Sequence, residues 1–232
     1  MTTYIKLKES NCKSCYKCIR SCPVKAIRFS DQQANIVIEE CILCGECVVS
    51  CPQNAKEVRS DVWLAEQLIL SGAPVYASVA PSFAANYEGA TIESIRNALA
   101  KLGFYDAEET AVGATVVKKE YERLVREGKQ KVNISTSCHS INSLIQKYYP
   151  EALPYTAHVL SPMLVHGKQL KQRDPAAKTV FIGPCISKKE EAELYGGMID
   201  CVLTFEEFDQ WLRKRNIKLE QQPRTPSEDG RT

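Results

Sequence analysis

The sequence predicts two domains of different fold class: a small α+β domain over residues 1–58 and a larger α/β domain over residues 59–232. Two observations predict this division. Eight of the 11 cysteines lie between Cys12 and Cys51, in two runs with the same spacing. After Arg59, short apolar segments alternate with segments whose apolar residues recur at helical spacing, which is typical of a mostly parallel sheet covered by helices.

The composition is that of an ordinary globular protein, with 44% hydrophobic residues, 25% charged residues and a formal net charge of +2. Interspersed charges of this kind exert no strong pull on nucleic acid or anionic lipid. The longest weakly polar run, residues 74–85, is shorter than the roughly 20 residues that cross a bilayer. Residues 1–10 lack the apolar core of a secretory signal. We therefore expect a cytoplasmic protein that binds neither nucleic acid nor membrane.

The spacing of the clustered cysteines indicates what they bind. Both runs read C-x2-C-x2-C-x3-C-P. They consist of Cys12, Cys15, Cys18 and Cys22 before Pro23, and of Cys41, Cys44, Cys47 and Cys51 before Pro52. A zinc site usually takes two separated C-x2-C pairs, whereas three thiolates at successive three-residue steps suit one iron–sulfur cubane. In the two-cluster ferredoxin pattern, the fourth cysteine of each run ligates the other cluster.

This pattern predicts two [4Fe–4S] clusters, each held by residues of both runs. The first takes Cys12, Cys15, Cys18 and Cys51, and the second takes Cys41, Cys44, Cys47 and Cys22. Residues 26–29 and 35–38 alternate like the strands of a β-hairpin, so that one unit of cluster loop, short helix and strand occurs twice. The segment resembles a bacterial-type two-[4Fe–4S] ferredoxin. Such modules in longer chains usually carry electrons to a second redox site.

The rest of the chain yields a series of alternating elements. Ser60 or Asp61 can cap a helix that stops at Gly72, and Thr91 can cap another that stops at Gly103. Further helices are expected over residues 111–127, 141–149 and 206–215, and from about residue 188. Strands are expected over residues 74–80, 131–135, 178–182 and 201–204.

Two further cysteines follow predicted strands. Cys138 comes after strand 131–135 at the start of a helix, and Cys185 comes after strand 178–182. Ligands of open α/β sheets bind beyond the carboxyl ends of strands, and helix N-termini there favour thiolates. The pair is therefore a candidate for half of a metal site, while two buried, inert cysteines fit these positions equally well.

Longer motifs around these cysteines resemble the active-site loops of [FeFe]-hydrogenases. Residues 135–140 read Ser-Thr-Ser-Cys-His-Ser, similar to the family's Thr-Ser-Cys-Cys-Pro. Residues 183–191 read Gly-Pro-Cys-x-x-Lys-x-x-Glu, similar to Met-Pro-Cys-x-x-Lys-x-x-Glu. Residues 148–151 and 161–163, between these two loops, match what the family carries there, and residues 200–207 resemble the family's downstream strand and helix. The fold implied is an α+β two-[4Fe–4S] ferredoxin-like domain followed by a partial α/β H-cluster domain.

The resemblance also implies roles for four residues. Cys138 and Cys185 would be two of the four thiolates that hold the cubane of the H-cluster. Lys188 would hydrogen-bond a cyanide of the attached diiron unit, because an ammonium can donate three hydrogen bonds. Ser137 stands where the efficient hydrogenases carry a proton-relaying cysteine, and members without that cysteine resemble the sensory branch of the family.

The chain departs from the family in other ways. His139 replaces the usual proline, where it could tune or coordinate iron, and Gly183 replaces the usual methionine. The family's other two ligands lie in a later Cys-x3-Cys loop, but no cysteine follows Cys201 here. A third [4Fe–4S] cluster is therefore expected only if ligands come from elsewhere, and no diiron unit is expected in this chain alone. Residues 227–232 resemble a mid-domain stretch, which indicates a truncated or split form, or else a natural short paralogue.

The remaining candidate residues have simpler interpretations. Cys201 opens a predicted strand and is expected in the core. His158 and His166 have no partner at metal-ligand spacing and are expected to be structural or on the surface. Glu120 and Glu122 fall near the family's proton-relay glutamate, although the solvated face of a helix explains them equally well.

The sequence therefore predicts an iron–sulfur electron-transfer protein of the [FeFe]-hydrogenase family, of the slow, hydrogen-sensing type. A complete member interconverts hydrogen with protons and electrons, whereas this chain alone is expected to be inactive with hydrogen. Its expected partners are a redox protein such as a ferredoxin and a signalling protein, and its cofactors suit an anaerobic cell. Two alternatives stay open: a non-catalytic electron carrier whose α/β domain is a docking platform, and an iron–sulfur scaffold with a vestigial hydrogenase domain.

Overall fold

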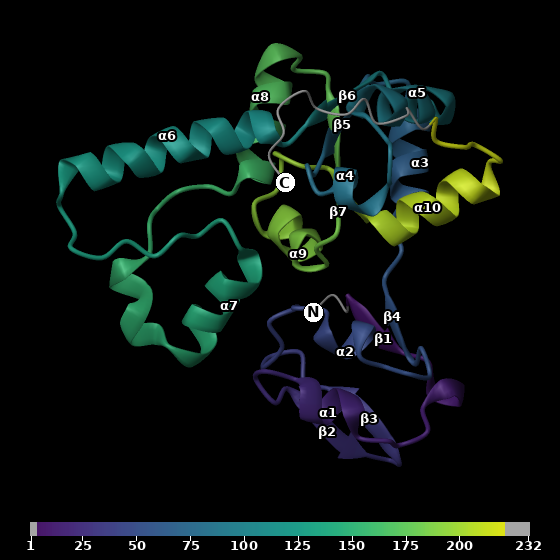
Figure 1. Ribbon diagram of the computed structural model, residues 1–232, viewed down its shortest axis with the longest axis vertical. Coiled ribbons are helices and arrows are strands. Elements are labelled where there is room, and N and C mark those ends of the chain that lie inside the picture. The colour runs from purple at the N-terminus through teal and green to yellow at the C-terminus, as the bar shows by residue number, and fades with distance from the viewer. Residues whose placement is uncertain (1–3, 221–232) are drawn as a thin grey trace, which may run out of the picture.

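The computed structural model describes residues 4–220 of the chain. Figure 1 shows two parts, a small N-terminal part in purple and a larger part whose helices surround a parallel sheet. The N-terminal part extends from β1 (Ile5–Leu7) to β4 (Lys56–Val58), and the larger part begins with α3 (Val62–Leu70).

The N-terminal part consists of two copies of one β–α–β unit. The first copy contains β1, α1 (Lys17–Ser21) and β2 (Ile27–Ser30), with the short 3₁₀ helix η1 (Glu9–Asn11) before the first cysteine run. The second copy contains β3 (Gln33–Ile36), α2 (Glu46–Val49) and β4. The strands pair between the copies, β1 with β4 and β2 with β3, and both pairs are antiparallel.

The repeat extends to single backbone angles. Ser14 and Leu43 both have φ of 53°, and Lys25 and Asn54 have φ of 55° and 50°. In each of these pairs, the two residues occupy equivalent places in the two copies. The predicted hairpin is confirmed as β2–β3, whose turn residues 31 and 32 have φ of 51° and 59°, as in a type I′ turn. The predicted internal repeat is therefore present in the fold.

The larger part is built on a four-stranded parallel sheet with the order β6–β5–β7–β8. Its strands are β5 (Val75–Val79), β6 (Asp106–Glu109), β7 (Lys178–Gly183) and β8 (Cys201–Thr204). Its other helices are α4 (Phe83–Asn86), α5 (Ile92–Leu102), α6 (Ala111–Glu127), α7 (His139–Tyr148), η2 (Pro150–Tyr155), α8 (Pro162–Arg173), α9 (Ser187–Leu194) and α10 (Phe205–Lys214). α8 packs on β5 and β7, and α10 packs on β7 and β8.

The core of this part lies between the sheet and its helices. The strands contribute fully buried Ile182 and Leu203, and the helices contribute Ile95, Leu99 and Trp211. Burial of each such side chain is worth about 1.5–3 kcal/mol. Two helices start at capping boxes, α5 at Thr91 and α10 at Thr204, which fixes their direction at the sheet edge.

The sheet differs from the sequence prediction at two places, a predicted strand that does not form and a strand that was not predicted. Residues 131–135 do not form a sheet strand, since only Ile134 makes an isolated bridge, to Thr156, and Val132 is 54% exposed. The segment is too open to gain from burial in the sheet. Strand β6 was not expected, because three of its four residues are acidic. It forms at the sheet edge, where Arg96 bonds to Asp106 and to the carbonyl of Ala107.

A buried ionic cluster fixes α9 against its neighbours. Lys189 in α9 is fully buried, and its Nζ lies 2.8 Å from Asp61 Oδ2 and 2.9 Å from Glu207 Oε2. Arg59 continues the cluster, bonding to Asp61 at 2.9 Å and to Glu193 at 2.7 Å. Arg59 directly follows β4, Glu193 lies in the last turn of α9, and the hydroxyl of Tyr4 in the N-terminal part also donates to Glu193 Oε2 at 2.6 Å. These bonds join the two parts of the molecule.

Candidate metal centres

The eight clustered cysteines line two small cavities. Cys12, Cys15, Cys18 and Cys51, here called the first quartet, line one of them. Cys22, Cys41, Cys44 and Cys47, the second quartet, line the other. α1 explains why each cavity takes cysteines from both runs. It carries Cys18 on its buried side and ends at Ser21, directly before Cys22, which lines the second cavity. The structure thus brings the cysteines together in the two groups that the spacing indicates.

Backbone amides point at the sulfurs of both quartets. The N–H of Ala26 donates to Cys22 Sγ and that of Ala55 to Cys51 Sγ, both at 3.3 Å. These two bonds occupy equivalent places in the two copies. The N–H of Leu43 likewise donates to Cys41 Sγ at 3.4 Å. Amide donors of this kind stabilise negative charge on sulfur and tune iron–sulfur clusters.

The quartets fit a group that carries its own positive charge. Burial raises the pKa of Cys47 to about 12 and also raises the pKa of Cys18 and Cys41. The pKa of Cys12 is lowered, chiefly by a hydrogen bond from the backbone of Ser14. Buried thiols stay protonated near neutral pH unless a metal binds them, and coordination removes the proton outright. Eight soft donors around two cavities suit iron–sulfur clusters.

Cys138 and Cys185 lie on two loops that touch. Cys138 is exposed and forms the N-cap of α7, while Cys185 lies between β7 and α9, with its Sγ 3.1 Å from Ser187 Oγ. Lys188 Nζ donates to the carbonyl of Ser137 at 3.1 Å and so bridges the loops. The expected helix start at Cys138 is confirmed, although no sheet strand precedes it. In the part of the chain described, no three His, Cys, Asp or Glu side chains, those of the quartets included, form a group that could hold a single metal ion. A cubane is held differently, because each of its thiolates binds a different iron.

Lys188 and His139 are both held by acidic residues of α9. The Lys188 ammonium lies 2.5 Å from Glu191 Oε2, a carboxylate that is 3% exposed. His139 is buried, and its Nε2 lies 2.9 Å from Glu190 Oε2. This ring nitrogen is therefore engaged with a carboxylate, which leaves only Nδ1 for the iron contact that the sequence allowed.

The other lone candidates are structural or on the surface. Cys201 is 3% exposed in β8, as expected of a core residue, and burial raises its pKa well above the usual range. His166 is 1% exposed and bridges Ser78 to Glu108, a network the sequence did not indicate. His158 is exposed at the rim of a cavity.

Glu120 and Glu122 belong to the surface of α6. Glu120 pairs with Arg123, which lowers the pKa of its carboxyl, and Glu122 pairs with Lys118 and Arg126. These pairs favour the solvated-face explanation over a proton relay.

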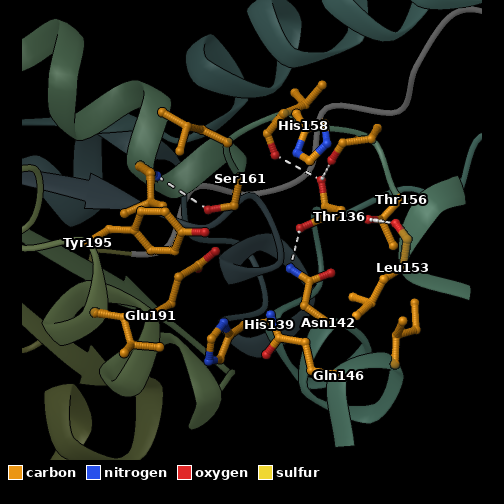
Figure 2. A pocket seen from close by; sticks show the side chains of 16 residues that line it. Thr136, His139, Asn142, Gln146, Leu153, Thr156, His158, Ser161, Glu191 and Tyr195 are labelled. Carbon is orange, nitrogen blue, oxygen red and sulfur yellow. Dashed lines mark hydrogen bonds between the residues drawn. The ribbon is translucent and has the colours of Figure 1, made fainter. Parts of the chain in front are cut away.

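A cavity of about 430 Å³ lies between α7, η2, α8 and α9, and no sequence signal indicated it. Figure 2 shows Thr136, His139, Asn142, Ser161 and Glu191 around it. The amide nitrogen of Asn142 donates to the carbonyl of Thr136 at 2.8 Å, while its Oδ1 is buried without a hydrogen-bond partner in the described part of the chain. The lining is drawn from residues far apart in sequence, which explains why spacing rules miss it.

The second quartet is the one in contact with the larger part. Near the end of α7, Lys147 Nζ donates to the carbonyl of Cys41 at 2.6 Å, and the Tyr148 hydroxyl donates to that of Glu40 at 2.7 Å. A Cβ at Gly45, in the second cysteine run, would lie 3.2 Å from Ile186 Cδ1, the residue after Cys185. α7 therefore extends from Cys138 to the second quartet.

Comparison with known proteins agrees with this architecture. Residues 73–231 match the family described as iron-only hydrogenase large subunit, C-terminal domain, and residues 4–52 match the 4Fe-4S dicluster domain. The N-terminal match defines an iron–sulfur protein. Since the first match covers more than half of the chain, the chain belongs to the iron-only hydrogenase large-subunit family.

Individual relatives are similar to different extents. The periplasmic [Fe] hydrogenase large subunit of Nitratidesulfovibrio vulgaris is 30% identical over 95% of this chain and 60% of its own length. The cytosolic Fe-S cluster assembly factor NAR1 of Kluyveromyces lactis is 42% identical over 27% of this chain and 14% of its own length. The chain thus spans only part of both relatives.

A solved structure of the [FeFe]-hydrogenase HydA(deltaEFG), which concerns stepwise H-cluster assembly, has a similar fold. The TM-score is 0.60, with 71% of this chain and 49% of that chain covered at 20% identity. Among the described residues of our chain, no helix is long and apolar enough to cross a membrane.

Proposed function

We propose that this chain is an iron–sulfur electron-transfer protein with two [4Fe–4S] clusters, one in each quartet. The observation that carries the proposal is the pair of cavities, each lined by three cysteines of one run and the fourth of the other. Bound cubanes of this type each accept and release one electron. The chain's own contribution is to supply eight thiolates, to direct amides at their sulfurs and to keep the two groups close together.

The proposed route for electrons connects, in this order, a partner protein, the first quartet, the second quartet and the loops of Cys138 and Cys185. The bonds from Lys147 and Tyr148 to the second cysteine run support this order. They attach the end of α7 to the second quartet, while the start of the same helix carries Cys138. A rigid helix fixes the separation on which electron transfer depends.

In a complete family member, we propose, the same chain forms one side of the H-cluster. Cys138 and Cys185 would supply two thiolates, and Lys188, held between Glu191 and the Ser137 carbonyl, would direct its ammonium at the anionic ligands. Ser137 is a poor proton relay because a hydroxyl holds its proton far above neutral pH. The activity proposed for the complete protein is slow, sensory-type interconversion of hydrogen, with none in this chain alone.

A second candidate function is favoured by one comparison. The relation to the Fe-S cluster assembly factor NAR1 supports a non-catalytic scaffold or electron carrier, in which Cys138 and Cys185 are vestigial. For both candidate functions the proposed partner is a redox protein. The sensory, hydrogenase-type function would add a signalling protein. The proposed location is an anaerobic cytoplasm, where thiols stay reduced; fractionation of the source cells tests it.

Iron and acid-labile sulfide per chain, after anaerobic reconstitution, test the proposal. About eight irons and no hydrogen uptake are expected for the wild-type chain. The matched variant Cys138→Ser/Cys185→Ser is expected to keep its iron. Loss of about four irons from that variant would show that the chain already holds a third cluster, and measurable hydrogen uptake by the wild type would overturn its proposed inactivity. Fewer than about eight irons in the wild type would contradict the two-cluster proposal itself.

A further inference from the structure

Lys56 is a buried lysine beside the first quartet. It begins β4, is 6% exposed, and lines the same cavity as Cys12, Cys18 and Cys51. Its Nζ donates a short hydrogen bond to the carbonyl of Ala34. Within residues 4–220, no carboxylate forms an ion pair with this ammonium. Lysine is rarely buried without such a pair, because removal of its charge from water is costly.

The internal repeat makes the position of Lys56 informative. Lys56 opens β4 as Ile27 opens β2, so the two residues occupy equivalent places in the two copies. Ile27 lines the second cavity, as Lys56 lines the first. The two cavities therefore differ at one matched place, with an ammonium beside the first quartet and an aliphatic side chain beside the second.

We propose that Lys56 holds the cluster of the first quartet at a higher reduction potential than the cluster of the second. This inference rests on the proposed function. One-electron reduction adds a negative charge to a cubane that four thiolates already make anionic, so a nearby fixed cation stabilises the reduced form. Potentials of such clusters depend on local charge, hydrogen bonds to sulfur and solvent exposure, and the charge of a buried side chain is screened less than that of an exposed one.

The position of the ammonium agrees with this assignment. Lys56 lines the first cavity and does not line the second. Its hydrogen bond to the carbonyl of Ala34, a residue that also lines the first cavity, holds the ammonium there. Because the interaction between charges falls with distance, this cation raises the potential of the first cluster more than that of the second.

The difference in reduction potential between the two clusters has a direction in the molecule. The second quartet is in contact with α7 and with Ile186, whereas the first cavity is lined by residues of the N-terminal part. An electron shared by the two clusters would thus reside on the outer one, away from the loops of Cys138 and Cys185. Lys56 would favour electron flow from the larger part toward a partner protein.

An EPR-monitored redox titration of the reconstituted chain tests this inference. The wild type is expected to show two reduction potentials. Lys56→Met is expected to lower the higher potential, that of the first quartet, more than the lower one, and so to narrow the gap between the two potentials. We expect at least a tenfold change in the equilibrium for electron exchange between the clusters, which corresponds to 59 mV for one electron. Lys17→Met, at an exposed lysine next to Cys18, is the matched control and should leave the gap nearly unchanged.

If the two reduction potentials differ by the same amount in Lys56→Met and in the wild type, and both chains hold about eight irons, the inference about Lys56 is wrong while the two-cluster proposal stands. A wild type without about eight irons would instead overturn the proposed function. If Lys56→Met fails to hold iron, Lys56→Gln, which can keep a hydrogen bond to the Ala34 carbonyl without the charge, is titrated under the same criterion.

Discussion

Replacement of Lys189 by methionine is expected to be among the most destabilising single changes in the larger part. The ammonium is fully buried and bonds to Asp61, to Glu207 and, at 2.8 Å, to the carbonyl of Val202. Methionine fills a similar volume but leaves two buried carboxylates facing each other without the cation. Breaking a buried pair in this way costs about 3–5 kcal/mol.

The loss in the free energy of unfolding can be measured by urea denaturation under anaerobic conditions, followed through the fluorescence of the buried Trp211. For a chain of this length it corresponds to a fall in melting temperature of roughly 6–20 °C. Lys214→Met, an exposed position in α10, is the control and should change stability by less than about 0.5 kcal/mol. A loss below about 1 kcal/mol in Lys189→Met would refute the view that this cluster holds α9 in place.

Three other substitutions test separate parts of the larger domain, each by urea denaturation. Burial lowers the pKa of His166, so that as the pH falls this side chain takes up its proton in the unfolded chain before it does so in the folded chain. Stability should therefore fall as pH drops below about 6.5, and His166→Gln should make stability depend less on pH. An equal slope in the variant would contradict the assignment. Gly113→Ala places a methyl against the carbonyl of Pro162 where α6 meets α8, and a loss of about 1–3 kcal/mol is expected; a neutral result would mean that the helices can separate freely. Thr204→Ala removes the capping box of α10 and should cost about 1 kcal/mol, whereas Thr204→Ser should retain most of it.

Local rules predicted the N-terminal part well. Each cysteine run contains only short loops and a single helical turn, so its spacing predicts which sulfurs line the same cavity. The grouping that places Cys22 with Cys41 follows from α1, which directs Cys18 and Cys22 into different cavities. The hairpin followed from alternation and was confirmed in the pairing of β2 with β3.

Long-range effects decided what the sequence did not reveal. Segment 131–135 has strand-forming residues, yet it receives no partner strand beyond one bridge at Ile134. The acidic β6 forms because it pairs with β5, about 30 residues earlier in the chain, while the nearer Arg96 on α5 binds Asp106 and the carbonyl of Ala107. The buried place of Lys56 depends on strand pairing around the repeat, and nothing in its neighbours along the chain distinguishes it from a surface lysine.

The two crossed cluster sites are tested most directly by the EPR spectrum of the reduced, anaerobically reconstituted chain, recorded with its iron and acid-labile sulfide content. We expect about eight irons and eight sulfides per chain, and a spectrum broadened by magnetic interaction between two neighbouring cubanes. A single four-iron cluster, or tightly bound zinc in place of iron, would contradict the crossed arrangement of the two quartets.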